Sequence, residues 1–227
     1  FRQNTTLTVS HGYGSNNLKF QTVKSDVRKY WRFGRDYTFA VRGFFGKSLG
    51  PNKQKFFLGG IPYLLAGGGE TNGQEDNSHF REVLLDTSNA SLIHDIYFTE
   101  YAWPLRGARF AERFGNNTSL FNLEVRFPFI NYLALGFPLK VIFGNIRGHA
   151  FMDIGAAWDS PDEFASTQWP ERYGPNASGN YSPWVTTAGL GTKINLGYFL
   201  LKIEMAWDKN PNGYSKPQWY FSLGPDW

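Results

Sequence analysis

The chain contains no cysteine among its 227 residues. This absence excludes disulfide scaffolds, thiolate metal sites and cysteine nucleophiles together. The sequence also has no run of roughly 18 consecutive apolar residues, so a membrane-spanning helix is excluded. Dense basic runs are lacking too: the net charge of +4 comes from scattered Lys and Arg, whereas a nucleic-acid site needs clustered basic residues. We therefore expect no nucleic-acid partner.

Histidine is scarce. The four histidines show no metal-ligand spacing, and no nucleophile motif accompanies them; they are His11, His79, His94 and His149. We therefore predict no metal site, no cofactor and no enzymatic activity. A chain that begins at Phe1 without a signal-peptide pattern is also expected to be a processed or truncated piece of a longer protein.

Aromatic residues and glycine are abundant. Aromatics make up 18% of the chain, beside 25 Gly and a mean hydropathy of −0.40. This mixture is typical of a transmembrane β-barrel, which alternates apolar and polar residues and carries aromatic girdles at both membrane interfaces. The negative hydropathy argues against membrane helices, but it fits a barrel in which half of each strand faces a wet lumen.

Period-two alternation recurs along the chain and predicts an all-β fold of eight antiparallel strands. The clearest strand places Phe121 and Val125 on one face and Asn122 and Glu124 on the other. We expect Phe121, Val125, Ile154, Leu190 and Ile203 to face outward on neighbouring strands. The predicted strands are 5–13, 18–33, 37–45, 120–129, 149–158, 184–196, 200–207 and 218–227.

Short and long connections alternate between these strands. Gly34 to Asp36 and Gly197 to Tyr198 are tight turns, whereas about 70 residues join the third and fourth strands. Outer-membrane barrels have short periplasmic turns and long extracellular loops, and a soluble sandwich has no reason for such a bias. The sequence therefore predicts one outer-membrane barrel domain over 1–227, with a long extracellular loop at about 47–118.

The end of the chain is a second signal. Trp219, Phe221, Leu223 and the terminal Trp227 share one parity, so the last strand has one apolar face and an aromatic end. An outer-membrane barrel needs such a strand to sit against lipid and to be recognised during insertion. We interpret these four residues as a C-terminal insertion signal and seam strand; a buried strand of a soluble sandwich is the alternative.

The long loop carries one candidate site. If it folds back into the lumen, the guanidinium of Arg106 would meet Glu124 and Asp153, which the alternation places on inner faces. Bidentate hydrogen bonds from arginine to carboxylate are strong and directional, so such a network can fasten a loop. The alternative is that all three are ordinary wetted lumen residues.

At these residues the chain resembles the C-terminal half of the barrel in the bacterial surface antigen superfamily, which includes BamA, TamA and the two-partner secretion transporters. The matching pieces occur in the family's order. They are Phe57-Leu-Gly-Gly60, Leu105-Arg-Gly107, Asn122-Leu-Glu-Val-Arg-Phe-Pro128, Phe151-Met-Asp-Ile-Gly155 and Phe221-Ser-Leu-Gly-Pro-Asp-Trp227. The variant of Leu105-Arg-Gly107 preceded by Pro104 is most similar to barrels fused behind a Tol-type β-propeller.

The resemblance implies a barrel of about sixteen strands, of which eight are present here. It also implies that Arg106 and Gly107 belong to a docking motif whose arginine binds Glu124 and Asp153 as a loop latch. The chain departs from the family at Ala108, where the motif has an aromatic, and Phe110 is a possible substitute. A long insertion also separates Gly60 from Leu105, so either the motif has been displaced or the latch has been lost.

These features predict a non-enzymatic protein of the bacterial outer membrane. By resemblance, it would insert or translocate polypeptides by strand templating at the barrel seam, a form of β-augmentation. Its expected partners are outer-membrane lipid, other envelope proteins and further strands of the same barrel. Two alternatives stay open: a structural barrel that anchors a propeller or a surface partner, and a small passive pore.

Overall fold

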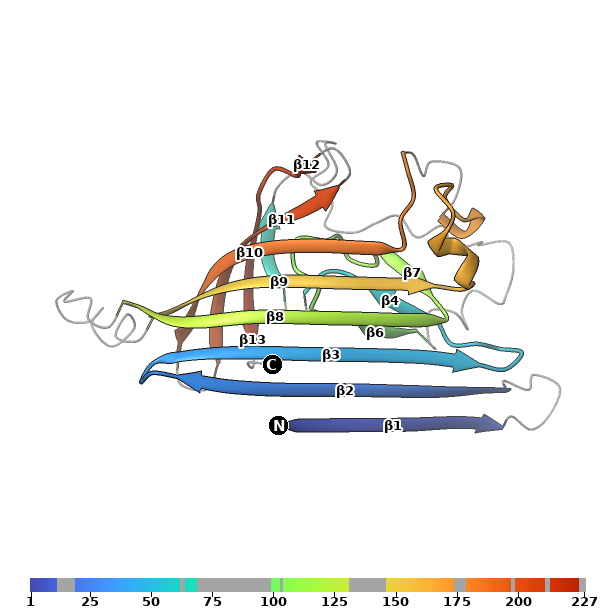
Figure 1. Cartoon of the computed structure of the whole chain (residues 1–227), viewed down its shortest axis with the longest axis horizontal. Helices are drawn as coiled ribbons and strands as arrows, with labels where there is room; N and C mark the ends of the chain where they lie inside the picture. Colours follow the sequence, from blue (N-terminus) through green and yellow to red (C-terminus); the bar gives the residue numbers. More distant parts are fainter. Residues whose placement is uncertain are drawn as a thin grey trace.

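A computed structural model of the chain describes residues 1–11, 19–61, 64–68, 99–102, 104–130, 146–173, 179–196, 199–210 and 213–224. Its main feature is one curved antiparallel sheet in which the strands follow the order β1-β2-β3-β8-β9-β10-β11-β13-β5 (Figure 1). The eight long strands predicted from the alternation are confirmed. They are β1 (Arg2–His11), β2 (Lys19–Phe33), β3 (Tyr37–Leu49), β8 (Asn117–Ile130), β9 (Ile146–Trp158), β10 (Trp184–Asn195), β11 (Leu200–Asn210) and β13 (Gln218–Gly224).

The two faces of the sheet differ as the alternation requires. On β8, Asn122 and Glu124 are buried, whereas Phe121 and Val125 are exposed. The expected outward residues on the neighbouring strands, Ile154, Leu190 and Ile203, lie on the same face, opposite Asp153 and Glu204, which are buried. One face is therefore an apolar outer wall, and the other is a polar inner wall.

The two ends of the strands also differ. At one end, β2 and β3 are joined by a tight turn whose Gly34 has φ 68°, a left-handed conformation that glycine adopts without strain. At the opposite end lie the connections from β3 to β8 and from β9 to β10 (Figure 1). We call these the short-turn end and the loop end. Of the predicted connections, the structure describes the tight turn at Gly34 to Asp36 and parts of the long connection from β3 to β8, whereas 197–198 lies outside the described residues.

The long connection between β3 and β8 is partly folded against the inner wall. It forms a small sheet in the order β6-β4-β7, made of β6 (Glu100–Ala102), β4 (Phe56–Leu58) and β7 (Arg113–Gly115). Phe56 and Leu58 are fully buried. A Cβ on Gly46 would lie 2.6 Å from the Phe56 ring, and a Cβ on Gly155 would lie 2.9 Å from Leu58. These inner-face glycines therefore leave the room that the small sheet occupies.

The same connection supplies β5 (Leu64–Gly68), which pairs antiparallel with the outer edge of β13. The sequence predicted that further strands of the same barrel would be the partners of the chain. Over the stretch from Trp219 to Ser222, the edge of β13 is paired instead with a segment of the chain itself. An unpaired edge exposes backbone donors and acceptors, which explains why a nearby extended segment occupies it. The sheet is open, with β1 at one end and β5 at the other.

Three small elements complete the described part of the chain. Two are short helical turns, η1 (Pro161–Phe164) and η2 (Glu171–Tyr173), and the third is the strand β12 (Gly213–Tyr214). Within the described ranges, the chain has no helix that is long and apolar enough to cross a membrane.

Candidate functional site

The segment that carries Arg106 lies against the inner wall in a fixed backbone conformation. The amide of Leu105 donates to the carbonyl of Gly60 at 3.0 Å, and the two residues form an isolated antiparallel bridge. Gly60 and Leu105 border the long insertion on either side, so the inserted chain leaves and returns at one point. That Leu105-Arg-Gly107 is the family's docking motif displaced by an insertion stays a prediction.

The structure brings Arg106 together with both carboxylates singled out from the sequence. Its Nε and Nη2 donate to the two oxygens of Asp153 at 2.8 and 2.9 Å, and its backbone amide donates to the same carboxylate at 3.1 Å. Nη1 donates to Glu124 at 2.9 Å. Arg106 is 1% exposed, and both carboxylates are 0% exposed. The alternative of three wetted lumen residues therefore does not fit this geometry.

Two further contacts were not singled out from the sequence. Nη1 of Arg106 also lies 3.2 Å from Glu204 Oε1, and its guanidinium stacks on the ring of Phe151, 3.6 Å from the centroid. Glu204 shares the inward parity of Lys202 and Ala206, so the alternation of that strand could have identified it. Phe151 is thus an aromatic partner of the arginine. Ala108, at the position where the family has an aromatic, packs into a buried apolar cluster, and the ring of Phe110 lies against Tyr101.

The backbone around Arg106 is held by side chains of the wall. Asn122 donates to the Pro104 carbonyl at 2.8 Å, and Gln218 donates to the Gly107 carbonyl at 3.2 Å. Gly107 has φ 85°, and a Cβ there would lie 2.9 Å from Ala206. A residue with a side chain would therefore meet both backbone strain and the wall, so glycine is required at this position.

The charges around Arg106 form a connected network. Glu124 also accepts from Arg126 at 2.6 Å and from Lys193 at 2.5 Å, and Glu204 lies 2.9 Å from His149 Nε2. Burying an ion is costly unless it is paired and hydrogen-bonded, and this network meets both conditions for Arg106. The arrangement can fix a loop segment to four strands of the wall, because the segment contacts Glu124 of β8, Asp153 of β9, Glu204 of β11 and Gln218 of β13.

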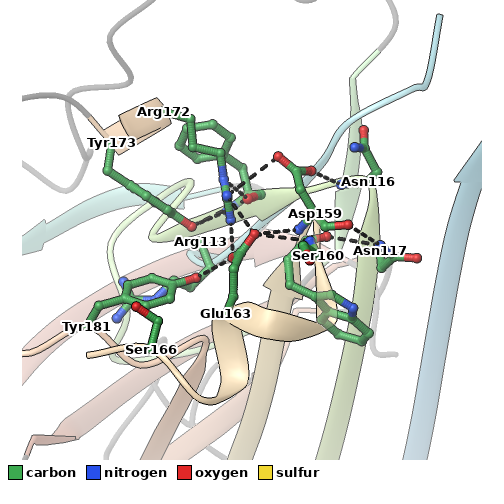
Figure 2. Close-up of polar contacts among 12 residues, drawn as sticks. Arg113, Asn116, Asn117, Asp159, Ser160, Glu163, Ser166, Arg172, Tyr173 and Tyr181 are labelled. Atoms are coloured by element: carbon green, nitrogen blue, oxygen red, sulfur yellow. Dashed lines mark hydrogen bonds and ion pairs between the residues drawn. The ribbon is translucent and has the colours of Figure 1, made fainter. Parts of the chain in front are cut away.

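A second polar cluster holds the loop between β9 and β10 at the loop end (Figure 2). Glu163 accepts from Arg172 through both oxygens at 2.8 and 2.6 Å and from the hydroxyl of Tyr181 at 2.9 Å. Its Oε1 also accepts from the backbone amides of Asp159 and Ser160. Arg172 in turn donates to the carbonyl of Phe114 in β7 at 3.0 Å, so the cluster joins this loop to the small inner sheet.

The environment of Glu163 perturbs the titration of the groups in this cluster. Burial alone would raise the pKa of Glu163, but the hydrogen bonds from Arg172, Asp159, Ser160 and Tyr181 outweigh it and lower the pKa from 4.5 to about 2. Burial raises the pKa of Tyr181 well above its ordinary value, and the neighbouring Tyr173 and Glu163 add to the effect. Glu163 is therefore a carboxylate, and Tyr181 a neutral donor, at neutral pH. Ser160 and Glu163 have the spacing of a capping box, and this pattern in the sequence could have predicted the helical turn that they begin.

The expected insertion signal lies on the outer face of β13 as far as the structure describes it. Trp219 and Phe221 are exposed, Leu223 is half-buried, and Tyr220 points to the inner side, where it is buried. Trp227 lies outside the described residues, and so do His79 and His94. In the described part of the chain, no group of three or more His, Cys, Asp or Glu is placed to hold a metal ion.

A comparison with protein-family profiles identifies the family of the chain. The profile of the Omp85 superfamily domain matches residues 1–227. Among solved structures, the chain is similar to CdiB from Acinetobacter baumannii, with 11% identity and a TM-score of 0.44, over 91% of this chain and 27% of that protein. The chain therefore spans less than a third of the length of this relative. No curated protein sequence matches the chain.

Proposed function

The chain belongs to the Omp85 superfamily, which includes outer-membrane proteins of polypeptide assembly and translocation, and from this premise we propose that it is the C-terminal part of a bacterial outer-membrane barrel that inserts or translocates polypeptides by pairing strands at β13. Within the superfamily, we place it with barrels of the BamA and TamA type, without enzymatic activity. Its partners in this proposal are lipid on the outer face and further strands of the same barrel.

The observation that carries the proposal is the pairing of β13 with β5. Trp219, Tyr220 and Phe221 pair with Gly68, Gly67 and Ala66, and the register then shifts so that Ser222 pairs with Leu64. β5 is distant from β13 in sequence and comes from the long loop. The edge of β13 thus accepts an extended segment through backbone hydrogen bonds, which is the contact that β-augmentation requires of a template.

The network around Arg106 supports the same proposal. Gln218, at the start of β13, donates to the carbonyl of Gly107, so the docked segment contacts the template strand directly. Tyr220 and Gln218 are hydrogen-bonded to each other through Tyr220 Oη and Gln218 Oε1. A loop fastened to β8, β9 and β11 by Arg106 would hold the inner face of β13 in place while its outer edge stays available for exchange.

The experiment is a reversible lock of β5 on β13. The chain has no cysteine, so the double variant Leu64→Cys with Ser222→Cys introduces the only two thiols of this chain at positions that are directly paired. Directly opposed residues in antiparallel strands lie about 4.5–5.5 Å apart between Cα atoms, within the range of disulfides. Assembly of a reporter barrel is followed in cells by its heat-modifiable mobility, before and after oxidation.

We expect oxidation to reduce assembly to background and reduction to restore it, because a locked β5 keeps the template edge occupied. The two single cysteine variants are the matched controls, since they carry each substitution without the lock. Assembly that is unchanged by the lock would overturn strand pairing at this edge. That outcome would favour the structural barrel that anchors a propeller or surface partner.

A further inference from the structure

Three aromatic side chains meet at the rim of the wall at the loop end. The ring of Phe164 in η1 contacts the rings of Trp158 in β9 and Trp184 in β10, with centroids 5.0 and 5.8 Å away, and both contacts are edge-on. Edge-on packing is one of the preferred arrangements of aromatic pairs. We call Trp158, Phe164 and Trp184 the aromatic clasp.

The strand register places the clasp on the outer face. Thr186 of β10 pairs directly with Ile154 of β9, which faces outward. Trp158 and Trp184 lie four and two positions along the same strands, and alternate residues of a strand share a face, so both tryptophans point outward. Phe164 belongs to the loop between β9 and β10, yet its ring lies on the outer side of the wall, against these two side chains.

The other side of η1 is fixed to the interior of the loop. Glu163, next to Phe164 in the chain, is buried and accepts from Arg172 and Tyr181 (Figure 2). The capping box at Ser160 holds the start of the same turn. Because the turn is fixed on this side, the ring of Phe164, which is 41% exposed, is held in place on the outer side.

The clasp lies where the outer face changes from apolar to polar. Along β9 toward the short-turn end, it is continuous with Ile154 and Met152 of the apolar outer wall. In the opposite direction, Asp162 of η1 is exposed. Aromatic side chains with this placement are enriched at the interface between a membrane and water. The surroundings therefore indicate lipid as the partner of the clasp.

The same boundary continues beside the clasp on β11 and β12. Lys209 pairs directly with Thr186 on one side and with Tyr214 on the other, so all three point outward. Both Lys209 and Tyr214 are exposed. At a lipid interface the ammonium can reach the headgroup phosphates while the tyrosine ring lies at headgroup level. The core of a protein interface is depleted of lysine, so this combination favours lipid over a protein partner.

We propose that the aromatic clasp binds the leaflet at the loop end, with Phe164 at the boundary between acyl chains and headgroups. The proposal rests on the membrane barrel of the proposed function and adds a lipid contact from a loop, outside the strands of the wall. The preceding residue, Glu163, binds Arg172, which donates to the carbonyl of Phe114 in β7. Lipid at the clasp therefore fixes the depth of the loop that is joined to the small inner sheet.

The test measures the depth of a spin label in a bilayer. The full-length protein that contains this chain is reconstituted into vesicles of phosphatidylethanolamine and phosphatidylglycerol, with any thiol outside this chain replaced by serine. A nitroxide is attached in turn to Phe164→Cys, Asp162→Cys and Leu190→Cys, since the chain itself has no cysteine. Power saturation compares collisions with oxygen, which concentrates among acyl chains, and with a nickel complex, which stays in water. Asp162 is the matched control in the same turn, and Leu190 is the reference on the outer wall.

We expect the ratio of oxygen to nickel collisions at Phe164→Cys to be at least about threefold higher than at Asp162→Cys, because only the first label enters the apolar side of the interface. Equal ratios at the two positions would overturn the proposal. A label at Phe164→Cys that neither reagent reaches would place the ring under protein and would also overturn it. Heat-modifiable mobility confirms that each variant is folded.

A second measurement keeps an aromatic ring in the clasp. Phe164→Trp and Asp162→Trp each add one tryptophan, and lipids brominated near the headgroups quench tryptophan fluorescence at short range. We expect the added fluorescence of Phe164→Trp to be quenched more strongly than that of Asp162→Trp. Equal quenching of the two would contradict lipid contact at the clasp.

The reference position separates this outcome from that of the proposed function. Lipid contact at Leu190→Cys with water contact at Phe164→Cys would remove the clasp and leave the barrel wall and strand pairing at β13 standing. Water contact at both positions would contradict the membrane wall on which the proposed function depends. The cysteine lock of β5 is read without a spin label, so a failure of strand pairing leaves the depth measured at the clasp unaffected.

Discussion

Arg106 donates three hydrogen bonds to Asp153, two from its guanidinium and one from its backbone amide. The carboxylate thus holds both the side chain and the main chain of the docked segment. Removing one partner of a buried ion pair costs about 3–5 kcal/mol, because the other charge stays buried without compensation. We expect Arg106→Ala to loosen the segment and to lower assembly activity, with smaller effects on folding of the wall. Hydrogen exchange of residues 104–116 and reporter assembly measure the two effects.

The matched control for this substitution is Arg106→Lys. Lysine keeps the charge, but it cannot reproduce the fork that reaches Asp153 and Glu124 together. We expect an intermediate loss of protection in the segment. Native exchange rates in the Ala variant would show that the Arg106 network does not fasten the loop.

Gly107 and Gly179 have the same backbone conformation but different surroundings, so alanine variants at the two positions can be compared. Both have positive φ, 85° and 82°, but a Cβ on Gly107 would meet Ala206 at 2.9 Å, whereas a Cβ on Gly179 has nothing within 4 Å. Both alanine variants carry backbone strain of about 1–3 kcal/mol. We expect Gly107→Ala to destabilise the docked segment clearly more than Gly179→Ala does, as measured by urea unfolding in lipid vesicles. Equal destabilisation would mean that Gly107 is not in close contact with the wall.

The lowered pKa of Glu163 predicts that the stability of the loop between β9 and β10 depends on pH. Its pKa is lowered from 4.5 to about 2 in the folded protein, so its stabilising contribution is fully present above pH 4.5. The contribution is lost as the pH falls from 4.5 toward 2, because protonation removes the carboxylate that accepts from Arg172 and Tyr181. We expect the protection factors of residues 159–173 and 179–183, corrected for intrinsic exchange, to decline across this window.

The variant Glu163→Gln provides the comparison. It cannot titrate, so its protection should be low and should stay flat across the same pH window. A parent protein whose protection does not change between pH 5 and 2 would contradict the assigned pairing.

The outer face of β13 leads to a prediction about insertion. An incoming barrel must offer a strand with a free edge and apolar side chains that can enter lipid. Deleting Trp227, or replacing Phe221 by Asp, should leave synthesis intact and cause periplasmic accumulation and degradation. A charge facing lipid adds a penalty of up to about 2–4 kcal/mol for the costliest residues and less for Asp, so the truncation is the cleaner test. Normal outer-membrane levels of a chain ending at Asp226 would show that the terminal aromatic is ordinary packing.

The sequence predicted the long strands because one-residue slips are heavily penalised in a wall with one apolar and one polar face. On β8, such a slip would turn Glu124 toward lipid, and the structure places it fully buried on the inner side. The same parity argument put Glu124 and Asp153 on one face, where Arg106 contacts both. That these contacts fasten the loop during assembly stays a prediction.

Other features depend on contacts between segments that are distant in sequence, which period-two alternation does not encode. The pairing of β5 with β13 joins residues near 66 to residues near 221 through backbone groups alone. The need for glycine at Gly46 and Gly155 comes from the close approach of Phe56 and Leu58, which belong to a distant segment of the chain. Glu204 was recognisable as an inward carboxylate, but its part in the Arg106 network requires the curvature that brings β11 toward β8.

The most direct test of strand pairing at β13 is disulfide trapping between Ser222→Cys and a substrate barrel that carries single cysteines along its own terminal strand. The account predicts adducts in one register, strongest at every second substrate position, because alternate side chains of paired strands share a face. Adducts should be lost when β5 is held on β13 by a second cysteine pair, Ala66→Cys with Phe221→Cys. A folded protein that assembles the substrate without any adduct at Ser222→Cys, or with adducts at all positions alike, would contradict it.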